Sequence, residues 1–171
     1  MSIVLITGSC GLVGSESVKF FCEKGFDVIG IDNNYRKFFF GSDGDTNWVK
    51  KNLTKEQKNY LHFSLNILNY SSLEKIFKKY RKRIKLIIHS AAQPSHDLAK
   101  KIPIIDFKVN ALSTLNLLEL TKIYCPDSPF IFMSTNKVYG DNPNLLPLKE
   151  NKSRWELNKK HKLFKGIDEK M

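Results

Sequence analysis

Three glycines in the segment TGSCGLVG constrain the fold of this chain more than any other feature. They follow the apolar run IVLI at residues 3–6 and precede a stretch whose apolar residues recur with helical spacing. In such a turn Gly8 permits the tight bend, Gly11 lets a pyrophosphate approach the backbone, and Gly14 permits close contact between helix and strand. The segment therefore predicts a strand, a phosphate-binding turn and a helix whose N-terminus attracts the anion.

A carboxylate follows the second predicted strand. Asp32 directly ends the apolar run DVIGI at residues 27–31, 18 residues after the third glycine. A carboxylate in this place accepts hydrogen bonds from the adenosine ribose hydroxyls and repels a 2′-phosphate, which favours NAD over NADP as cofactor. Arg36 leaves NADP open as an alternative, because a nearby arginine can receive that phosphate.

Short apolar runs alternate with helical patterns over most of the chain. Strands are expected at 3–6, 27–31, 61–67, 84–92 and 129–135, and helices at 11–25, 71–83 and 106–125. Continuous apolar strands separated by helices predict an α/β fold, a Rossmann-like doubly wound parallel sheet with helices on both faces.

The remaining segments show no clear periodicity. We expect residues 33–53 to be irregular, with the aromatic run FFF at 38–40 packed onto the domain as a loop rather than stacking on a base. After Gly140 the apolar pattern dissolves. The sequence thus predicts a NAD-binding Rossmann domain over residues 1–140 and an irregular extension with one short helix over residues 141–171.

The chain is basic, with 28 Lys and Arg residues against 17 Asp and Glu residues and a formal net charge of +11. A nucleic-acid surface would explain this charge, but 24 of the 28 are lysines, which favours a solvated surface. Cys10, Cys22 and Cys125 lack the spacing of zinc ligands, so we expect a reduced, cytoplasmic protein without a metal site. No run approaches the ~20 apolar residues of a membrane helix. We expect neither nucleic acid nor a membrane as partner.

The spacing G-x-x-G-x-x-G resembles that of the extended short-chain dehydrogenase/reductase family, the NAD-dependent nucleotide-sugar epimerases and dehydratases. HSAAQ at 89–93, NALSTLNLLE at 110–119 and STNKVYG at 134–140 are similar to further motifs of that family, in the same order. DNNYRKFFFG at 32–41 and HSAAQPSHDLA at 89–99 resemble in particular the CDP-paratose 2-epimerases. The resemblance implies an enzyme that transiently oxidises a hydroxyl of a nucleotide-sugar substrate, a CDP-sugar, with NAD.

The resemblance also implies a role for individual residues. Thr135 would carry the catalytic hydroxyl, and Asn66 stands where the family usually has an Asp beside the adenine. The cofactor-binding residues would be Gly8, Cys10, Gly11, Leu12, Val13, Gly14, Asp32, Asn33, Asn66, Ile67, Ala91, Ala92, Gln93, Asn110 and Ser134. Substrate contacts would come from Ser95, His96 and Asn136, although an ordinary polar loop or turn would have the same composition.

The proton-moving pair of the family, a tyrosine with a lysine four positions later, does not occur in this sequence. None of the six tyrosines has a lysine at that spacing. In the family the pair lies on a helix after the position of Thr135, and that helix, the later strands and the substrate region would lie beyond Met171. Because loss of a general base costs about 10²–10⁴ in rate, we expect cofactor binding with little or no turnover.

Three alternatives follow from this absence. The chain would be the N-terminal part of a CDP-paratose 2-epimerase-like enzyme, the same part of an enzyme for another nucleotide sugar, or a non-catalytic dinucleotide-binding regulatory or interaction module. A sheet that ends early also exposes apolar surface, which predicts self-association.

Overall fold

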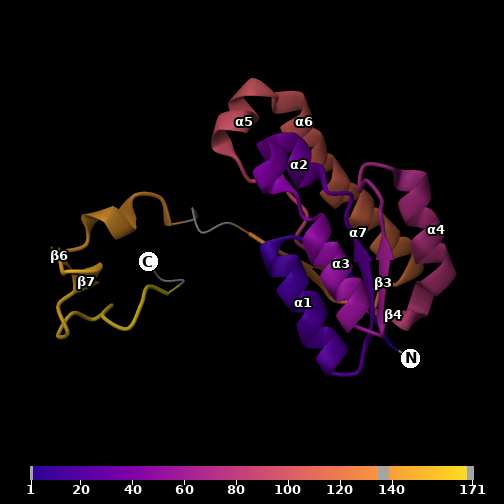
Figure 1. Ribbon diagram of the computed structural model, residues 1–171, viewed down its shortest axis with the longest axis horizontal. Coiled ribbons are helices and arrows are strands. Elements are labelled where there is room, and N and C mark those ends of the chain that lie inside the picture. The colour runs from indigo at the N-terminus through magenta and orange to yellow at the C-terminus, as the bar shows by residue number, and fades with distance from the viewer. Residues whose placement is uncertain (1, 135–138, 169–171) are drawn as a thin grey trace. The chain divides into compact units, whose positions relative to one another are not determined.

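The computed structural model describes residues 2–134 and 139–168 of the chain (Figure 1). The chain divides into two compact units, Met1–Met133 and Ser134–Met171. None of the helices in the described ranges is long and apolar enough to span a membrane.

The first unit is built on a five-stranded parallel sheet. Its strands are β1 (Ile3–Thr7), β2 (Asp27–Ile31), β3 (Tyr60–Phe63), β4 (Ile84–His89) and β5 (Phe130–Phe132). Their order is β3-β2-β1-β4-β5, and each neighbouring pair is parallel. The chain moves outward from β1 to β3 and then returns to the other side of β1, which creates a topological switch point between β1 and β4. The predicted α/β fold is confirmed.

Helices cover both faces of this sheet (Figure 1). The longer ones are α1 (Leu12–Glu23), α3 (Asn47–Glu56), α4 (Tyr70–Tyr80) and α7 (Ser113–Tyr124). Val4 and Ile6 of β1 belong to the buried cluster with α1 and α3, whereas Ile3 and Leu5 belong to the cluster with α4 and α7. Successive side chains of a strand point to opposite faces, so the unbroken apolar run of β1 is what a sheet covered on both sides requires.

The segment between β2 and β3 is more regular than its sequence indicates. It forms α2 (Tyr35–Phe40), the 3-10 turn η1 (Gly41–Gly44) and α3, so the expectation of an irregular segment at 33–53 is wrong. Within α3 only Leu53 is fully buried, because the helix is mostly solvated and packs through a single narrow edge. Because so few apolar residues face the core, the sequence of α3 shows little of the helical spacing from which a helix is predicted.

The approach to α7 also differs in detail from a single regular helix. Two short helices, α5 (His96–Lys101) and α6 (Pro103–Phe107), follow β4, and a π-helical turn, η3 (Lys108–Leu112), joins α6 to α7. The helix expected at 106–125 is therefore present but changes hydrogen-bonding pattern near its start. Such π-turns occur often beside functional sites.

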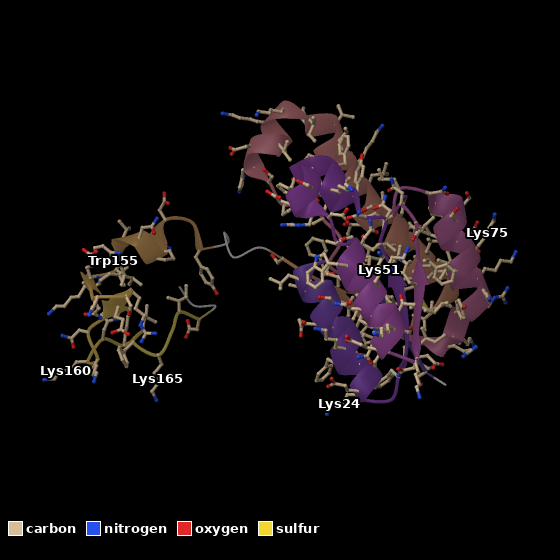
Figure 2. All side chains as sticks on the ribbon, in the orientation of Figure 1. Lys24, Lys51, Lys75, Trp155, Lys160 and Lys165 are labelled. Atoms are coloured by element: carbon tan, nitrogen blue, oxygen red, sulfur yellow. The ribbon has the colours of Figure 1, made fainter. Side chains whose placement is uncertain are left out.

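The second unit contains a 3-10 turn, η5 (Asn142–Leu145), and an antiparallel pair of strands, β6 (Leu148–Glu150) and β7 (Trp155–Leu157). The sequence predicted a loop with a short helix and missed this strand pair, whose strands are only three residues long. Lys160 and Lys165 of this unit, and Lys24 and Lys75 of the first, extend from the ribbon (Figure 2). These lysines are consistent with a solvated basic surface.

Candidate functional site

A pocket of about 250 Å³ lies where the carboxyl ends of the strands meet the glycine turn. Its walls come from the segments that directly follow β1, β2, β3 and β4. This is the edge at which open parallel sheets bind their ligands. Eleven of the predicted site residues line it: Gly8, Gly11, Leu12, Val13, Gly14, Asp32, Asn33, Asn66, Ile67, Ala91 and Ala92.

The glycine turn leaves no room for side chains at two of its three glycines. Gly8 has a φ of +69°, and a Cβ there would lie 2.7 Å from the amide nitrogen of Ala91. A Cβ on Gly14 would overlap the carbonyl group of Gly8. The Gly8 N–H donates to the Ile31 carbonyl at 2.8 Å, which joins the turn to the end of β2. The close backbone approach leaves the N-terminus of α1 open to a phosphate.

Asp32 is held by backbone amides from two directions. Its Oδ2 accepts a hydrogen bond from the N–H of Cys10 at 3.1 Å, and its Oδ1 accepts one from the N–H of Asn34 at 2.7 Å. Each carboxylate oxygen has a second lone pair, so Asp32 can still accept from two ligand hydroxyls. The residue thus presents a fixed acceptor to the pocket at the end of β2.

Cys10 contributes its amide rather than its thiol to this arrangement. The side chain is buried and does not line the pocket. Burial, and then the charge of Asp32, raise the pKa of the Cys10 thiol to about 11. The thiol therefore stays protonated at neutral pH and is a poor nucleophile.

Aromatic residues of α2 form a wall of the pocket that the sequence did not predict. Tyr35, Phe39 and Phe40 line it together with Arg36, whose guanidinium lies 4.8 Å from the centre of the Phe40 ring. Phe38 points elsewhere and stacks on Tyr35 with ring centres 5.0 Å apart. Residues 38–40 therefore lie in a helix rather than in the expected loop, and two of their three rings line the pocket. The i, i+4 spacing of Arg36 and Phe40 was the available signal for this helix.

Gln93 and Asn110 lie behind the pocket wall rather than in it. The Gln93 N–H donates to Asn110 Oδ1 at 2.8 Å, and Asn110 Nδ2 donates back to the Gln93 carbonyl at 3.1 Å. The Gln93 amide also donates to Asp106 at 2.7 Å. This network fixes the turn after β4, which carries the lining residues Ala91 and Ala92.

The predicted substrate residues are not gathered in the pocket. The hydroxyl of Ser95 accepts from the N–H of Leu98 at 3.3 Å and caps α5, and His96 is exposed. Ser134, after β5, is also exposed and does not line the pocket. Thr135 and Asn136 lie outside the described residues.

A buried histidine ties the sheet to α7 beneath the site, and the sequence reasoning missed it. Thr114 Oγ1 donates to the Asn110 carbonyl at 2.7 Å, so it accepts the proton of His89 Nε2 at 2.9 Å. His89 Nδ1 then accepts from the hydroxyl of Thr7 at 2.7 Å. Burial lowers the pKa of His89 to about 4, so the ring is neutral at pH 7. Nothing in the run IIHS indicated these partners, which are 82 and 25 residues away in sequence.

The donor set of the pocket fits a dinucleotide. It offers backbone amides at a helix N-terminus, the acceptor Asp32, and an apolar wall with aromatic rings. Within the described part of the chain, no group of three or more His, Cys, Asp or Glu side chains is placed to hold a metal ion. The fold and the pocket together define a Rossmann-like protein of the dinucleotide-binding class.

Comparison with known proteins gives the family. A sequence model of the GDP-mannose 4,6 dehydratase family matches residues 5–156. The chain belongs to this family, one of NAD-dependent epimerases and dehydratases. The predicted resemblance is thereby confirmed.

Individual relatives are epimerases. CDP-paratose 2-epimerase from Salmonella typhi is 33% identical over 138 residues, which cover 81% of this chain and 38% of that protein. The structure of UDP-glucose 4-epimerase from Thermotoga maritima with UDP-glucose has a TM-score of 0.66 at 31% identity, covering 85% of this chain and 42% of that one. The Thermus thermophilus UDP-glucose 4-epimerase complex with NAD has a TM-score of 0.56 at 28% identity, covering 71% and 34%. The chain spans about two fifths of the length of the curated relatives it matches.

Proposed function

We propose that this chain is the NAD-binding portion of a nucleotide-sugar epimerase. The observation that carries the proposal is the pocket at the switch point of the sheet, where the glycine turn and Asp32 meet. The family membership and the NAD complex of the Thermus thermophilus relative support the same cofactor. The proposed cofactor domain comprises residues 1–140.

The proposal gives each part of the pocket one task. Amides at the start of α1, near Gly11, would hold the pyrophosphate, and Asp32 would accept from the adenosine ribose hydroxyls. Asn66 and Ile67 would contact the adenine, and Phe39 lines the same pocket. Ala91 and Ala92 would lie along the cofactor, and Gln93 and Asn110 would act by fixing their turn.

The reaction proposed for the complete enzyme is a transient oxidation of a sugar hydroxyl. NAD would supply the hydride acceptor, and Thr135, with Ser134 before it and Asn136 after it, would lie beside the sugar. A CDP-sugar is the proposed substrate, because the chain is 33% identical to the CDP-paratose 2-epimerase of Salmonella typhi. Ser95 and His96 would contact that substrate from the loop after β4.

We propose that this chain by itself is inactive as an epimerase. No tyrosine in the sequence has a lysine four positions later, so the base that deprotonates the sugar hydroxyl is missing. The same observation favours a second candidate, a non-catalytic dinucleotide-binding regulatory or interaction module. Epimerisation assays on a CDP-sugar, with and without added partner protein, separate the two candidates.

We also propose self-association and a cytoplasmic location. Ile131, Phe132 and Met133 at the β5 edge are 41%, 55% and 37% exposed, and an apolar strand edge favours pairing with another chain. Cys10, Cys22 and Cys125 are free and buried, which fits a reducing compartment. Sedimentation over a hundredfold range of concentration tests the association, and a single monomeric species throughout would contradict it.

Calorimetric titration with NAD⁺ tests the proposed cofactor. Asp32→Ala removes the hydrogen bonds to the ribose, and because bonds to a charged group contribute about 1.5–3 kcal/mol, affinity should fall about tenfold to a hundredfold. Asp43→Ala is the matched control, since Asp43 is exposed and does not line the pocket. Folded protein that shows no binding of NAD⁺ or NADH at millimolar concentration would refute the proposal.

A further inference from the structure

The order of the strands gives the direction in which a dinucleotide would run through the pocket. Asn66 follows β3, Asp32 follows β2, and the glycine turn follows β1. If the adenosine and the pyrophosphate occupy these places, as the proposed function states, the rest of the cofactor lies beside β4, because β4 is the next strand of the sheet. The turn after β4 is then the wall for the nicotinamide riboside half.

The turn after β4 is attached to the last residue of β1. Thr7 is fully buried, and its carbonyl accepts hydrogen bonds from the Ser90 N–H at 3.2 Å and from the Ser90 hydroxyl at 2.7 Å. The hydroxyl oxygen of Thr7 accepts a longer one from the N–H of Ala91 at 3.4 Å. Ser90 and Ala91 line the pocket, whereas Thr7 does not. Thr7 therefore helps to determine where two residues of the wall lie.

His89 joins Thr7 to α7 through a chain of hydrogen bonds that all run in one direction. The Thr7 hydroxyl donates to His89 Nδ1 at 2.7 Å, and His89 Nε2 donates to Thr114 Oγ1 at 2.9 Å. The Thr114 hydroxyl donates in turn to the carbonyl of Asn110 at 2.7 Å, in the π-helical turn before α7. Reversal of the chain would take the Thr114 proton away from that carbonyl, so each link orients the next.

The far end of this chain holds the same turn from a second side. Asn110 Oδ1 accepts from the Gln93 N–H at 2.8 Å, and Asn110 Nδ2 donates to the Gln93 carbonyl at 3.1 Å. The turn at 90–93 is thus attached through Thr7 at its start and through Asn110 at its end. His89, which is 1% exposed, lies between the two attachments.

We propose that the chain Thr7–His89–Thr114 positions the turn after β4 for the nicotinamide riboside half of the cofactor. None of the three residues lines the pocket, so they act as positioning residues through Ser90, Ala91 and the backbone of Gln93. This inference rests on the proposed function.

The adenosine half should be independent of the chain. The glycine turn is fixed separately, by the hydrogen bond from the Gly8 N–H to the Ile31 carbonyl at 2.8 Å. Asp32 is held by the backbone amides of Cys10 and Asn34. Removal of the Thr114 link should therefore weaken binding of NAD⁺ but not of ADP, which contains the adenosine and both phosphates and lacks the nicotinamide riboside.

Calorimetric titrations of NAD⁺ and ADP into four forms of the 171-residue chain test the inference. The forms are the wild type, Thr114→Val, which removes the hydroxyl at nearly constant shape, Thr114→Ser, which keeps the hydroxyl, and Thr121→Val. Thr121 is the matched control, because it is buried in the same helix and donates to the Leu117 carbonyl at 2.7 Å, four residues earlier, without belonging to the chain. Circular dichroism verifies that each variant folds, and Thr114→Ala replaces Thr114→Val if the latter does not.

The wild type should bind NAD⁺ more tightly than ADP. Thr114→Val should weaken NAD⁺ binding about fivefold to tenfold, the size of one lost hydrogen bond, and leave ADP affinity within about twofold. Thr114→Ser and Thr121→Val should bind both ligands as the wild type does.

Four results overturn the inference: no loss of NAD⁺ affinity in Thr114→Val, an equal loss for ADP, a loss that persists in Thr114→Ser, or one of the same size in Thr121→Val. A wild type that binds NAD⁺ no more tightly than ADP overturns it as well. In each of these cases NAD⁺ binding by the wild type leaves the proposed function intact. A wild type that does not bind NAD⁺ refutes both.

Discussion

Lowering the pH from 7 to 5 should destabilise this protein through His89. The side chain is 1% exposed at the end of β4, and its two ring nitrogens are hydrogen-bonded to Thr7 and Thr114 in the neutral state. Burial lowers the pKa of His89 from 6.5 to about 4. Between these two pH values the unfolded chain binds a proton that the native protein does not. The unfolded state is therefore stabilised relative to the native state as the pH falls.

The magnitude follows from the two pKa values. His89 contributes fully to stability above pH 6.5, and its contribution is lost progressively as the pH falls towards 4. With one pKa unit equivalent to 1.36 kcal/mol, the free energy of unfolding at pH 5 should be about 2 kcal/mol lower than at pH 7 on account of this residue.

Urea unfolding followed by circular dichroism at pH 7 and pH 5 measures the effect. His89→Gln should be less stable than the wild type at pH 7, yet it should lose about 2 kcal/mol less between the two pH values. Contributions from carboxylates cancel in this difference. His96→Gln, at an exposed position, is the control and should keep the wild-type difference. Equal pH dependence in His89→Gln and the wild type would show that the burial argument is wrong.

Two further substitutions test packing around the site. Gly30→Ala would place a Cβ against the Tyr60 hydroxyl and Ser9 Oγ, so it should lower the free energy of unfolding by about 1–3 kcal/mol. Adding Tyr60→Phe to this variant removes the clashing hydroxyl and should restore part of the lost stability. An unchanged urea midpoint in Gly30→Ala would contradict this. Phe39→Ala should weaken NAD⁺ binding about tenfold, which is the usual effect of losing one aromatic contact to a base. Phe38 does not line the pocket, so Phe38→Ala should leave NAD⁺ binding unchanged. Equal effects of the two substitutions would exclude a role of Phe39 in the site.

The part of the site that would bind the pyrophosphate and the adenosine ribose can be predicted from short segments of the sequence. The glycine turn and Asp32 are predictable because the turn needs residues without a Cβ and because Asp32 directly follows an apolar strand. The sequence predicts all five strands of the parallel sheet, although β3, β4 and β5 are shorter than expected. Helices α2 and α3 escaped prediction, since a helix that buries only Leu53 has almost no apolar period.

The aromatic wall of the pocket and the hydrogen bonds around Tyr60 could not have been predicted in the same way. Phe39 lines the pocket because α2 follows β2 at the edge of the sheet where the pocket lies. The residues next to Phe39 in the sequence do not indicate this position. The Tyr60 hydroxyl reaches Ser9 across 51 residues, and it does so only because β3 lies beside β2, where Gly30 leaves space for it.

The amino-acid sequence by itself determined the α/β class, the family, the glycine turn and the acceptor Asp32, because each depends on residues close together along the chain. Only the tertiary structure decided which side chains surround that acceptor. Lys50 of α3, His62 of β3 and the rings of α2 lie around Asp32 because the order β3-β2-β1 brings these elements to one edge of the sheet. Such contacts depend on how whole helices and strands pack together, so they cannot be predicted from residues that are neighbours in the sequence.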